Sequence, residues 1–525
     1  MIGSFWAFMP AIVAIVLALL TKQVYVSLFV GILTGALMFA EGNPLRALGT
    51  LYSVMSEKVG ENVPIVVFLV ILGIFVVLMQ KSGGSRAYGN WAETKINSRS
   101  GALAATAGLG CLIFVDDYFN CLTVGSVMRP VTDKFKISHS KLAWIIDSTA
   151  APVCIIAPIS SWAAAVSGQL EGNGLVVFIK TIPFNVYAIL TIIMVFAFSY
   201  MNLDFGKMKK NEICAIETGD LNAGEVDLPT DEDSTIIENP KGKVRHLIVP
   251  VIILIACCVG GMIYSGFFYN WDTYTYGTEV QSANVLDAFA NCDAGSSLAI
   301  GSTIALFIVA AYYIIDKVVS FKEITDSITQ GFKAMVPAIL ILTFAWSISG
   351  IMGAKGGYLD AKAFVSENMA MIPPTVQALF PAIFFILACA IAFSTGTSWG
   401  TFGVLVPIAV TILGGEGTLV LITVSATLGG AVFGDHVSPI SDTTILASTG
   451  GNCNHVDHVK TQLPYAALVA SIAFVSYIVA GLCATLGGVL SAIITWVVAL
   501  ALFVGAVFGL KYLQNKNQNF QDKQA

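Results

Sequence analysis

Apolar runs of about 20 residues recur along the whole chain, with short polar stretches between them. A helix of this length crosses the hydrocarbon core of a bilayer, which is about 30 Å thick. The first run, 5–21, has no basic region before it and no cleavage site after it, so it is expected to be a spanning helix rather than a signal peptide. Only 11% of the residues are charged, against about 25% in soluble domains. The pattern predicts an all-α polytopic membrane protein.

A hydrophilic segment, 203–245, divides the apolar runs near the middle of the chain. Its central part, 211–240, contains nine acidic residues and no Lys or Arg, which is typical of a solvated linker. We therefore expect four parts. They are a first transmembrane repeat (1–202), an acidic cytoplasmic linker (203–245), a second transmembrane repeat (246–485), and an extra helix with a cytoplasmic tail (486–525).

The two halves carry polar interruptions in corresponding positions. "APISSW" (157–162) in the first half matches "SPISDT" (438–443) in the second, and "DDYFN" (116–120) matches "TGTSW" (395–399). Matching interruptions of this kind are typical of secondary transporters built from repeats.

The interruptions at 116–120 and 395–399 each lie between two apolar runs that are too short to span comfortably. We expect each pair of runs to form a re-entrant hairpin with its polar tip inside the membrane. Each half then has about five transmembrane helices and one hairpin, so that the second repeat is inverted, and one extra helix follows. The stretches 43–60 and 320–335 are predicted to be amphipathic surface helices.

The basic residues indicate how the chain is oriented. With the linker in the cytoplasm, 21 basic residues lie inside and five lie outside, while Arg129 lies within the membrane. Cytoplasmic loops carry such an excess of Lys and Arg. The sequence therefore predicts a multi-pass protein of the cell (plasma) membrane, with its N-terminus outside and its C-terminus in the cytoplasm.

Broken helices bring polar groups into the predicted membrane region. Pro152 and Pro158 interrupt the run 142–168, and Pro439 interrupts the run 418–448. A broken helix persists in a membrane only where it faces protein or a wet cavity. The freed carbonyls, together with carboxylates and hydroxyls, can form the all-oxygen shell that a hard cation such as Na⁺ requires.

We therefore predict an ion- or substrate-binding site at these breaks. Inserting a carboxylate into a membrane costs roughly 2.5–3.5 kcal/mol, so its presence there indicates a function. A carboxylate that holds either H⁺ or Na⁺ would exchange the two ions by competition. The candidate residues are Asp116, Asp117, Asn120, Arg129, Asp147, Ser160, Thr395, Thr397, Ser398, Asp435, His436, Ser438, Ser441 and Asp442. The predicted Na⁺ ligands are Asp117, Asp435 and Asp442.

Several candidates have structural alternatives, which the sequence leaves open. Asp116 is explained equally well by a salt bridge with Arg129, and Asp147 by a hydrogen bond to a neighbouring helix end. His436 is expected to be a hydrogen-bonding partner rather than a metal ligand. The hydroxyl groups can bond to backbone carbonyls of their own helices. The stretch "HVDH" (455–458) is expected to be a solvated face in a cytoplasmic loop.

The string "GDHVSPISDTTILAS" (434–448), with "FVDDYFN" (114–120) and "TSWGTFG" (397–403), resembles the NhaC family of sodium/proton antiporters. The resemblance covers most of the chain apart from the linker. It implies an inverted-repeat fold and a Na⁺- or H⁺-coupled carrier, in a family of Na⁺/H⁺ antiporters, a malate/lactate-type antiporter and predicted amino-acid transporters. The acidic residues of the family's motifs correspond to Asp117, Asp435 and Asp442.

Two transport functions fit the sequence. The first is Na⁺/H⁺ antiport through the membrane-embedded aspartates. The alternative is Na⁺- or H⁺-coupled transport or exchange of a small organic anion or amino acid. The residues that favour this alternative are Arg129, Tyr118, Phe119, Trp162 and Trp399, although the two tryptophans are equally explained by packing.

An enzyme is not expected. Asp435 follows "VFG" and therefore lacks the G-x-G-D context of an intramembrane aspartyl protease, and no Walker A string is present. The cysteines are scattered without ligand spacing, so no disulfide, zinc or other cofactor is indicated. The expected partners are the lipid bilayer, Na⁺, H⁺ and, in the alternative, a small organic solute, but no nucleic acid. A homodimer is one open arrangement.

Overall fold

The computed structural model describes residues 2–21, 23–170, 173–225, 239–270, 275–277, 280–282, 284–285, 288, 292–353, 358–368, 372–415 and 417–521. Within these residues, nine helices are long and apolar enough to cross a membrane. The strands there are β1 (Tyr269–Asn270) and β2 (Thr275–Tyr276), which pair antiparallel. The predicted all-α polytopic class is confirmed, with this small strand pair as an addition.

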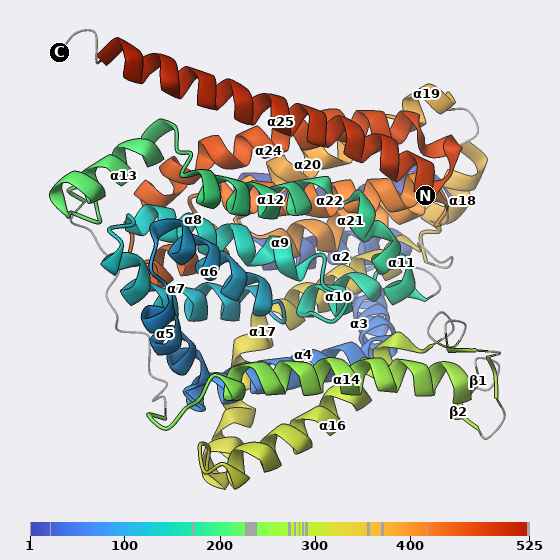
Figure 1. The fold of residues 1–525 in the computed structure, drawn as a ribbon. Helices are drawn as coiled ribbons and strands as arrows, with labels where there is room; N and C mark the ends of the chain where they lie inside the picture. The colour runs from blue at the N-terminus through green and yellow to red at the C-terminus, as the bar shows by residue number, and fades with distance from the viewer. Residues whose placement is uncertain are drawn as a thin grey trace.

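The first half and the central segment contain both long and short helices (Figure 1). They are η1 (Phe5–Phe8), α1 (Met9–Thr21), α2 (Val24–Phe39), α3 (Pro44–Glu61), α4 (Val63–Lys81), α5 (Gly84–Lys95), α6 (Arg99–Leu112), α7 (Asp117–Lys134), α8 (His139–Thr149), α9 (Ala151–Cys154), α10 (Ser161–Ser167), α11 (Gly174–Thr181), η2 (Ile182–Phe184), α12 (Val186–Met201) and α13 (Gly206–Thr218).

The second half also contains both long and short helices, and the longest helix of the described residues ends it. Its helices are α14 (Arg245–Phe268), α16 (Ala294–Ile315), α17 (Phe321–Met352), α18 (Ala361–Asn368), α19 (Pro374–Gln377), α20 (Phe380–Thr395), α21 (Ser398–Leu413), α22 (Thr418–His436), α23 (Asp442–Gly450), α24 (His455–Leu482), η5 (Ala484–Leu486) and α25 (Gly488–Gln521).

Most long helices run in one general direction, with α25 along one side of the bundle and α14 and α16 along the opposite side (Figure 1). One large cluster of buried apolar side chains joins most of the helices, and a smaller cluster joins α1, α2 and α3 to α17, α20 and α21. By contrast, α25 exposes large apolar side chains such as Val489 and Phe508. A helix with such an apolar outer surface suits contact with lipid.

Polar residues cap the helices that begin inside the bundle. Asp116 and Thr397 are extended residues whose side chains accept hydrogen bonds from Phe119 N (3.1 Å) and Gly400 N (3.4 Å), at the starts of α7 and α21. Such caps satisfy backbone donors that a helix start would leave unpaired. The interruptions that match in sequence thus cap matching helices, while the inverted orientation of the repeats stays a prediction.

The two stretches predicted to be amphipathic surface helices behave differently. The first forms α3, which buries Ala47, Leu51 and Val54 on one face. The second is continuous with the apolar run after it, so a separate helix at 320–335 is wrong. The single helix α17 starts at a capping box on Ser320 and runs through Pro337. Proline and glycine inside a membrane helix are tolerated where neighbouring groups satisfy the freed backbone groups, so Gly331 and Pro337 do not end the helix.

Part of the predicted linker is folded and buried. Residues 206–218 form α13, which buries Asn211 and Glu212. Glu212 pairs with Arg99 and accepts a hydrogen bond from Ser138 N (2.8 Å). The prediction of a solvated segment is therefore wrong for the buried face of this helix, because Glu212 has a basic partner elsewhere in the bundle. Residues 226–238 lie outside the described part of the chain, and the four-part division stays a prediction.

A buried ion pair lies near the junction of α12 and α13. Lys141 is 0% exposed, pairs with the carboxylate of Asp204, and lies 4.5 Å from the centre of the Trp144 ring. The hydroxyl of Tyr465 also donates to Asp204 Oδ1 (2.8 Å). A buried charge that loses its partner keeps its desolvation cost without compensation.

We expect Lys141→Met to destabilise the protein by about 3–5 kcal/mol, because it leaves Asp204 without its cation. The measurement is the thermal unfolding midpoint of the detergent-purified protein. The exposed Lys210→Met is the matched control and should leave the midpoint unchanged. Equal midpoints for the two variants would show that this ion pair does not stabilise the fold.

Candidate functional site

Two of the broken segments meet inside the bundle. The hydroxyl of Tyr118, at the start of α7, donates to Asp442 Oδ2 at the start of α23 (2.6 Å), although 324 positions separate the two residues. Further along the same contact, Gly125 lies against Gly450 so closely that an added Cβ would overlap its backbone. The interruptions of the two halves are therefore in direct contact.

Asp117 is buried beside this contact. Its Oδ2 accepts a hydrogen bond from Trp162 Nε1 (3.0 Å), while its Oδ1 has no hydrogen-bond partner. The ring of Trp162 packs against Trp399 and Phe402, with ring centres 5.6 and 5.1 Å apart. Trp162 thus both packs and donates, and it brings the start of α21 close to Asp117.

Asp435 lies at the end of α22, beside the start of α23. Thr443 Oγ1 donates to its Oδ2 (2.8 Å), and its Oδ1 has no partner. The neighbouring carboxylate, Asp442, accepts from Thr443 N (2.8 Å) in addition to Tyr118. Thr443 therefore links the two carboxylates that flank the break.

Asp147 is a hub between three helices. Its Oδ2 accepts hydrogen bonds from Gln462 Nε2 (2.6 Å) and Thr444 Oγ1 (3.1 Å), and it lies 3.3 Å from His458 Nε2. Its Oδ1 has no hydrogen-bond partner and lies 4.0 Å from His436 Nε2. Asp147 contacts side chains of several helices, which is more than the predicted bond to one helix end.

His436 makes the predicted hydrogen bond. Its Nδ1 lies 3.0 Å from the hydroxyl of Tyr187, and its backbone carbonyl accepts from Gln462 Nε2 (2.7 Å). These contacts tie α12, α22 and α24 together behind Asp435.

The predicted hydroxyl ligands donate to or cap backbone groups. Ser160, Thr397 and Ser441 cap α10, α21 and α23. The other three donate to carbonyl oxygens, which are Ile391 O for Thr395 (2.8 Å), Ala431 O for Ser398 (3.2 Å) and Phe393 O for Ser438 (2.7 Å). The predicted bond to a carbonyl of the same helix is confirmed for Thr395, whereas Ser398 and Ser438 donate to carbonyls of the neighbouring helices α22 and α20.

Asn120 holds the broken end of α6 in place. Its amide nitrogen donates to the carbonyls of Gly110 (2.7 Å), Ile113 (2.9 Å) and Thr149 (3.0 Å), while its Oδ1 has no partner. Carbonyls freed by the break are thereby satisfied inside the protein, as a broken membrane helix requires.

Arg129 lies away from these carboxylates. It follows Asp116 by 13 positions on the same helix, which corresponds to a rise of about 20 Å at 1.5 Å per residue. The predicted alternative of an Asp116–Arg129 salt bridge is therefore wrong, and Arg129 lies far along α7 from Asp116 and Asp117.

The predicted Na⁺ ligands do not form one three-carboxylate group. Among the described residues, no cluster of three or more His, Cys, Asp or Glu side chains could hold a metal ion. Separate donors hold the three carboxylates, namely Trp162 for Asp117, Thr443 for Asp435 and Tyr118 for Asp442. A cation here would instead be bound by mixed oxygen atoms.

Buried oxygen atoms without a donor are the main feature of this site. Buried polar groups in proteins nearly always have a hydrogen-bond partner. In the described part of the chain, the buried carboxylate and amide oxygens that lack one at the breaks are Asp117 Oδ1, Asn120 Oδ1, Asp147 Oδ1, Asp435 Oδ1 and Gln462 Oε1. Such oxygens suit a bound cation or proton.

Comparison with known proteins identifies the family. Residues 173–482 match the Na⁺/H⁺ antiporter family. This chain belongs to that family. The resemblance expected from the motifs is confirmed, and this member of the Na⁺/H⁺ antiporter family is a multi-pass membrane protein and a secondary transporter.

The proteins similar to this chain include one without a named substrate and two whose names give different substrates. An uncharacterised protein of Haemophilus influenzae is 41% identical over 498 residues, which cover 91% of each chain. The malate-2H⁺/Na⁺-lactate antiporter of Bacillus subtilis is 31% identical over 27% of this chain and 30% of its own length. The arginine/ornithine antiporter of Halobacterium salinarum is 38% identical over 22% of this chain and 24% of its own.

Among solved structures, the YdaH transporter of Alcanivorax borkumensis has a TM-score of 0.48 and 12% sequence identity. The match covers 88% of this chain and 98% of that chain.

The candidate site also contains His458, which lies in a stretch that the sequence predicted to be solvated. Asp457 and His458 are buried, so the prediction of a solvated "HVDH" face is wrong. The error arose because the stretch begins α24, whose inner face packs against α8. His458 and Gln462 lie four positions apart and share that face, a spacing that could have indicated their common role.

Replacing Gln462 by Leu in this antiporter-family protein should destabilise it. The change leaves Asp147 Oδ2 without its shortest donor and His436 O without its donor. Each buried acceptor that loses a donor costs about 1–3 kcal/mol. We expect a lower thermal unfolding midpoint in detergent, whereas the exposed Gln330→Leu should leave it unchanged. An unchanged midpoint for Gln462→Leu would contradict the proposed hub.

Proposed function

We propose that this protein is a Na⁺/H⁺ antiporter of the plasma membrane, whose membrane-embedded aspartates alternately bind Na⁺ and H⁺. The observation that carries the proposal is the meeting of the two broken segments, α7 and α23, through Tyr118 and Asp442. Around that contact lie buried carboxylate oxygens without donors, on Asp117, Asp147 and Asp435.

The hydrogen bonds around the site suggest how the two ions compete. One oxygen of Asp117 and one of Asp435 accept from Trp162 and Thr443, and these bonds orient each carboxylate and stabilise its negative charge. The other oxygen of each carboxylate is free to accept either a proton or a share of a Na⁺ ion. Because both ions use the same oxygen, release of one permits binding of the other.

The contact between the halves would also couple binding to movement. Transporters built from repeats expose a central site alternately by moving one group of helices against another. Here α7 and α23 are joined at their starts, so they are expected to move together and to carry the carboxylates with them. The N-terminus is proposed to lie outside and the C-terminus in the cytoplasm, on the distribution of basic residues.

The second candidate function is Na⁺- or H⁺-coupled exchange of a small organic anion or amino acid. Arg129 no longer favours this second function, because it lies far along α7 from Asp116 and Asp117. Two observations still favour it. The aromatic pair Trp162 and Trp399 lies beside Asp117. The names of two partial relatives describe exchange of malate and lactate or of arginine and ornithine.

Transport by purified protein in liposomes tests the proposal. An imposed Na⁺ gradient should change the internal pH, reported by an enclosed pH-sensitive dye, in the absence of any organic solute. Asp435→Asn should reduce this signal to that of empty liposomes, since the amide has neither an exchangeable proton nor the negative charge that balances Na⁺. The exposed Asp326→Asn should retain it.

The same assay separates the two candidates. A Na⁺-driven pH change that requires an added organic solute would support the second function instead of the first. Full exchange by correctly folded Asp435→Asn would contradict the carboxylate mechanism for both candidate functions.

A further inference from the structure

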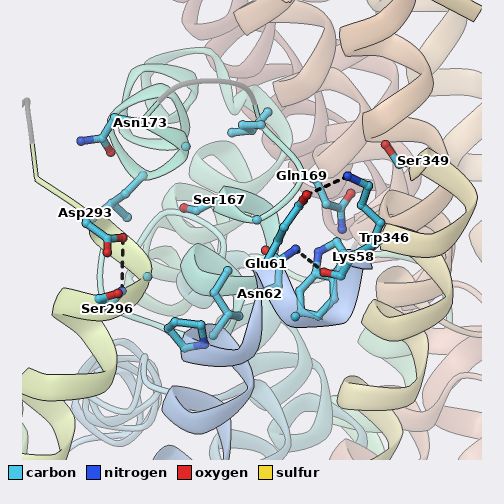
Figure 2. A pocket seen from close by; sticks show the side chains of 18 of the residues that line it. Lys58, Glu61, Asn62, Ser167, Gln169, Asn173, Asp293, Ser296, Trp346 and Ser349 are labelled. Carbon is cyan, nitrogen blue, oxygen red and sulfur yellow. Dashed lines mark hydrogen bonds and ion pairs between the residues drawn. The ribbon is translucent and has the colours of Figure 1, made fainter. Parts of the chain in front are cut away.

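A large polar cavity lies beyond the carboxylate site, at the other end of α10. Its volume is about 790 Å³, within the range of about 300–1,000 Å³ typical of small-molecule sites. Trp162, in the first turn of α10, contacts Asp117, whereas Ser167 and Gly168, at its end, line the cavity. The cavity walls come from both halves of the chain, as Figure 2 shows for Lys58, Glu61, Gln169, Asp293 and Trp346.

Two buried side chains of the cavity wall have polar atoms without partners. Gln169 is 9% exposed, and neither its amide nitrogen nor its amide oxygen has a hydrogen-bond partner. Trp346 is 3% exposed, and its indole nitrogen has none either. A buried donor or acceptor is rarely left unpaired, so these groups indicate a ligand with complementary polar atoms.

The backbone at this wall leaves room for those groups. Gly168 has an ordinary right-handed helical conformation (φ −67°), so its lack of a side chain is not needed for a turn. A Cβ at Gly168 would lie 2.9 Å from Asn62 Oδ1 and 3.2 Å from Trp346 Nε1. An alanine at this position would therefore crowd the indole N–H.

The cavity wall is negatively charged. Lys58 pairs with Glu57 (2.7 Å) and Glu61 (2.8 Å). Burial alone would lower the pKa of Lys58, but its bonds to the two carboxylates outweigh burial and raise that pKa, so the ammonium stays charged. With Asp293, the wall carries three carboxylates against one ammonium. This excess attracts cationic groups and disfavours a solute that carries only negative charge.

We propose that this cavity binds a small zwitterionic solute with a primary ammonium group, of the amino-acid class. The ammonium would face the carboxylates of Glu57, Glu61 and Asp293. The solute's carboxylate would accept hydrogen bonds from the Trp346 indole and the Gln169 amide. A Na⁺ ion cannot accept a hydrogen bond from the indole N–H, which can only donate. The inference rests on the second candidate function, of which it names a solute class and an entry site.

Binding to the purified full-length protein in detergent tests this inference. The probes are the individual proteinogenic L-amino acids, with L-malate as a solute that lacks the ammonium group. We expect at least one amino acid to raise the thermal unfolding midpoint in a saturable manner, because a ligand that binds only the folded state stabilises it. No stabilisation by any amino acid, or stabilisation by L-malate alone, would overturn the proposal.

Two variants place the binding in this cavity. Trp346→Phe keeps the aromatic ring but removes the N–H, and we expect it to weaken the affinity about tenfold or more. Gly168→Ala should weaken it as well, while the exposed Trp91→Phe is the control and should bind normally. Unchanged affinity in both cavity variants would assign the bound amino acid to another site and overturn the proposal.

The carboxylate variant separates this inference from the transport mechanism. Asp435→Asn, which is expected to lose Na⁺-driven exchange, should still be stabilised by the same amino acid. Retained binding with lost exchange supports both proposals, and retained binding with normal exchange refutes only the carboxylate mechanism. Loss of binding in Asp435→Asn would contradict a separate site at the end of α10.

Discussion

The architecture depends on one constraint, which is that a helix broken inside a membrane must find partners for its exposed polar groups within the protein. The chain meets this constraint by bringing its breaks together. Asn120 collects the carbonyls at the end of α6, Asp116 caps α7, and Tyr118 bonds across to the break that begins α23. The same atoms that stabilise the breaks therefore bring carboxylates into the middle of the bundle.

Local pattern predicted much of this arrangement. The apolar runs gave the spanning helices, and the prolines and acidic residues marked the interruptions, because both signals depend on neighbouring residues alone. The matched motifs also located equivalent caps, as Ser160 and Ser441 show. The separate surface helix predicted at 320–335 is instead the first part of α17 (Phe321–Met352), because a weakly polar stretch can continue an apolar helix without a visible boundary.

Contacts between distant segments could not be read from the sequence. Glu212 looked like part of a solvated linker, yet Arg99 neutralises it from 113 positions away. His458 looked like part of a solvated face in a cytoplasmic loop, but it turns towards Asp147 on α8. In each case a polar residue is buried because its partner is distant in the chain, and composition alone contains no information about that partner.

The close approach of Gly125 and Gly450 has a consequence for how the halves evolve. Between α7 and α23 the main chains touch directly, so no side chain there can adjust to absorb a change. Any residue other than glycine at either position would wedge the helices apart and lengthen the Tyr118–Asp442 bond. The two halves are thus free to diverge in their outer surfaces, while mutation at this point of main-chain contact is restricted to silent changes.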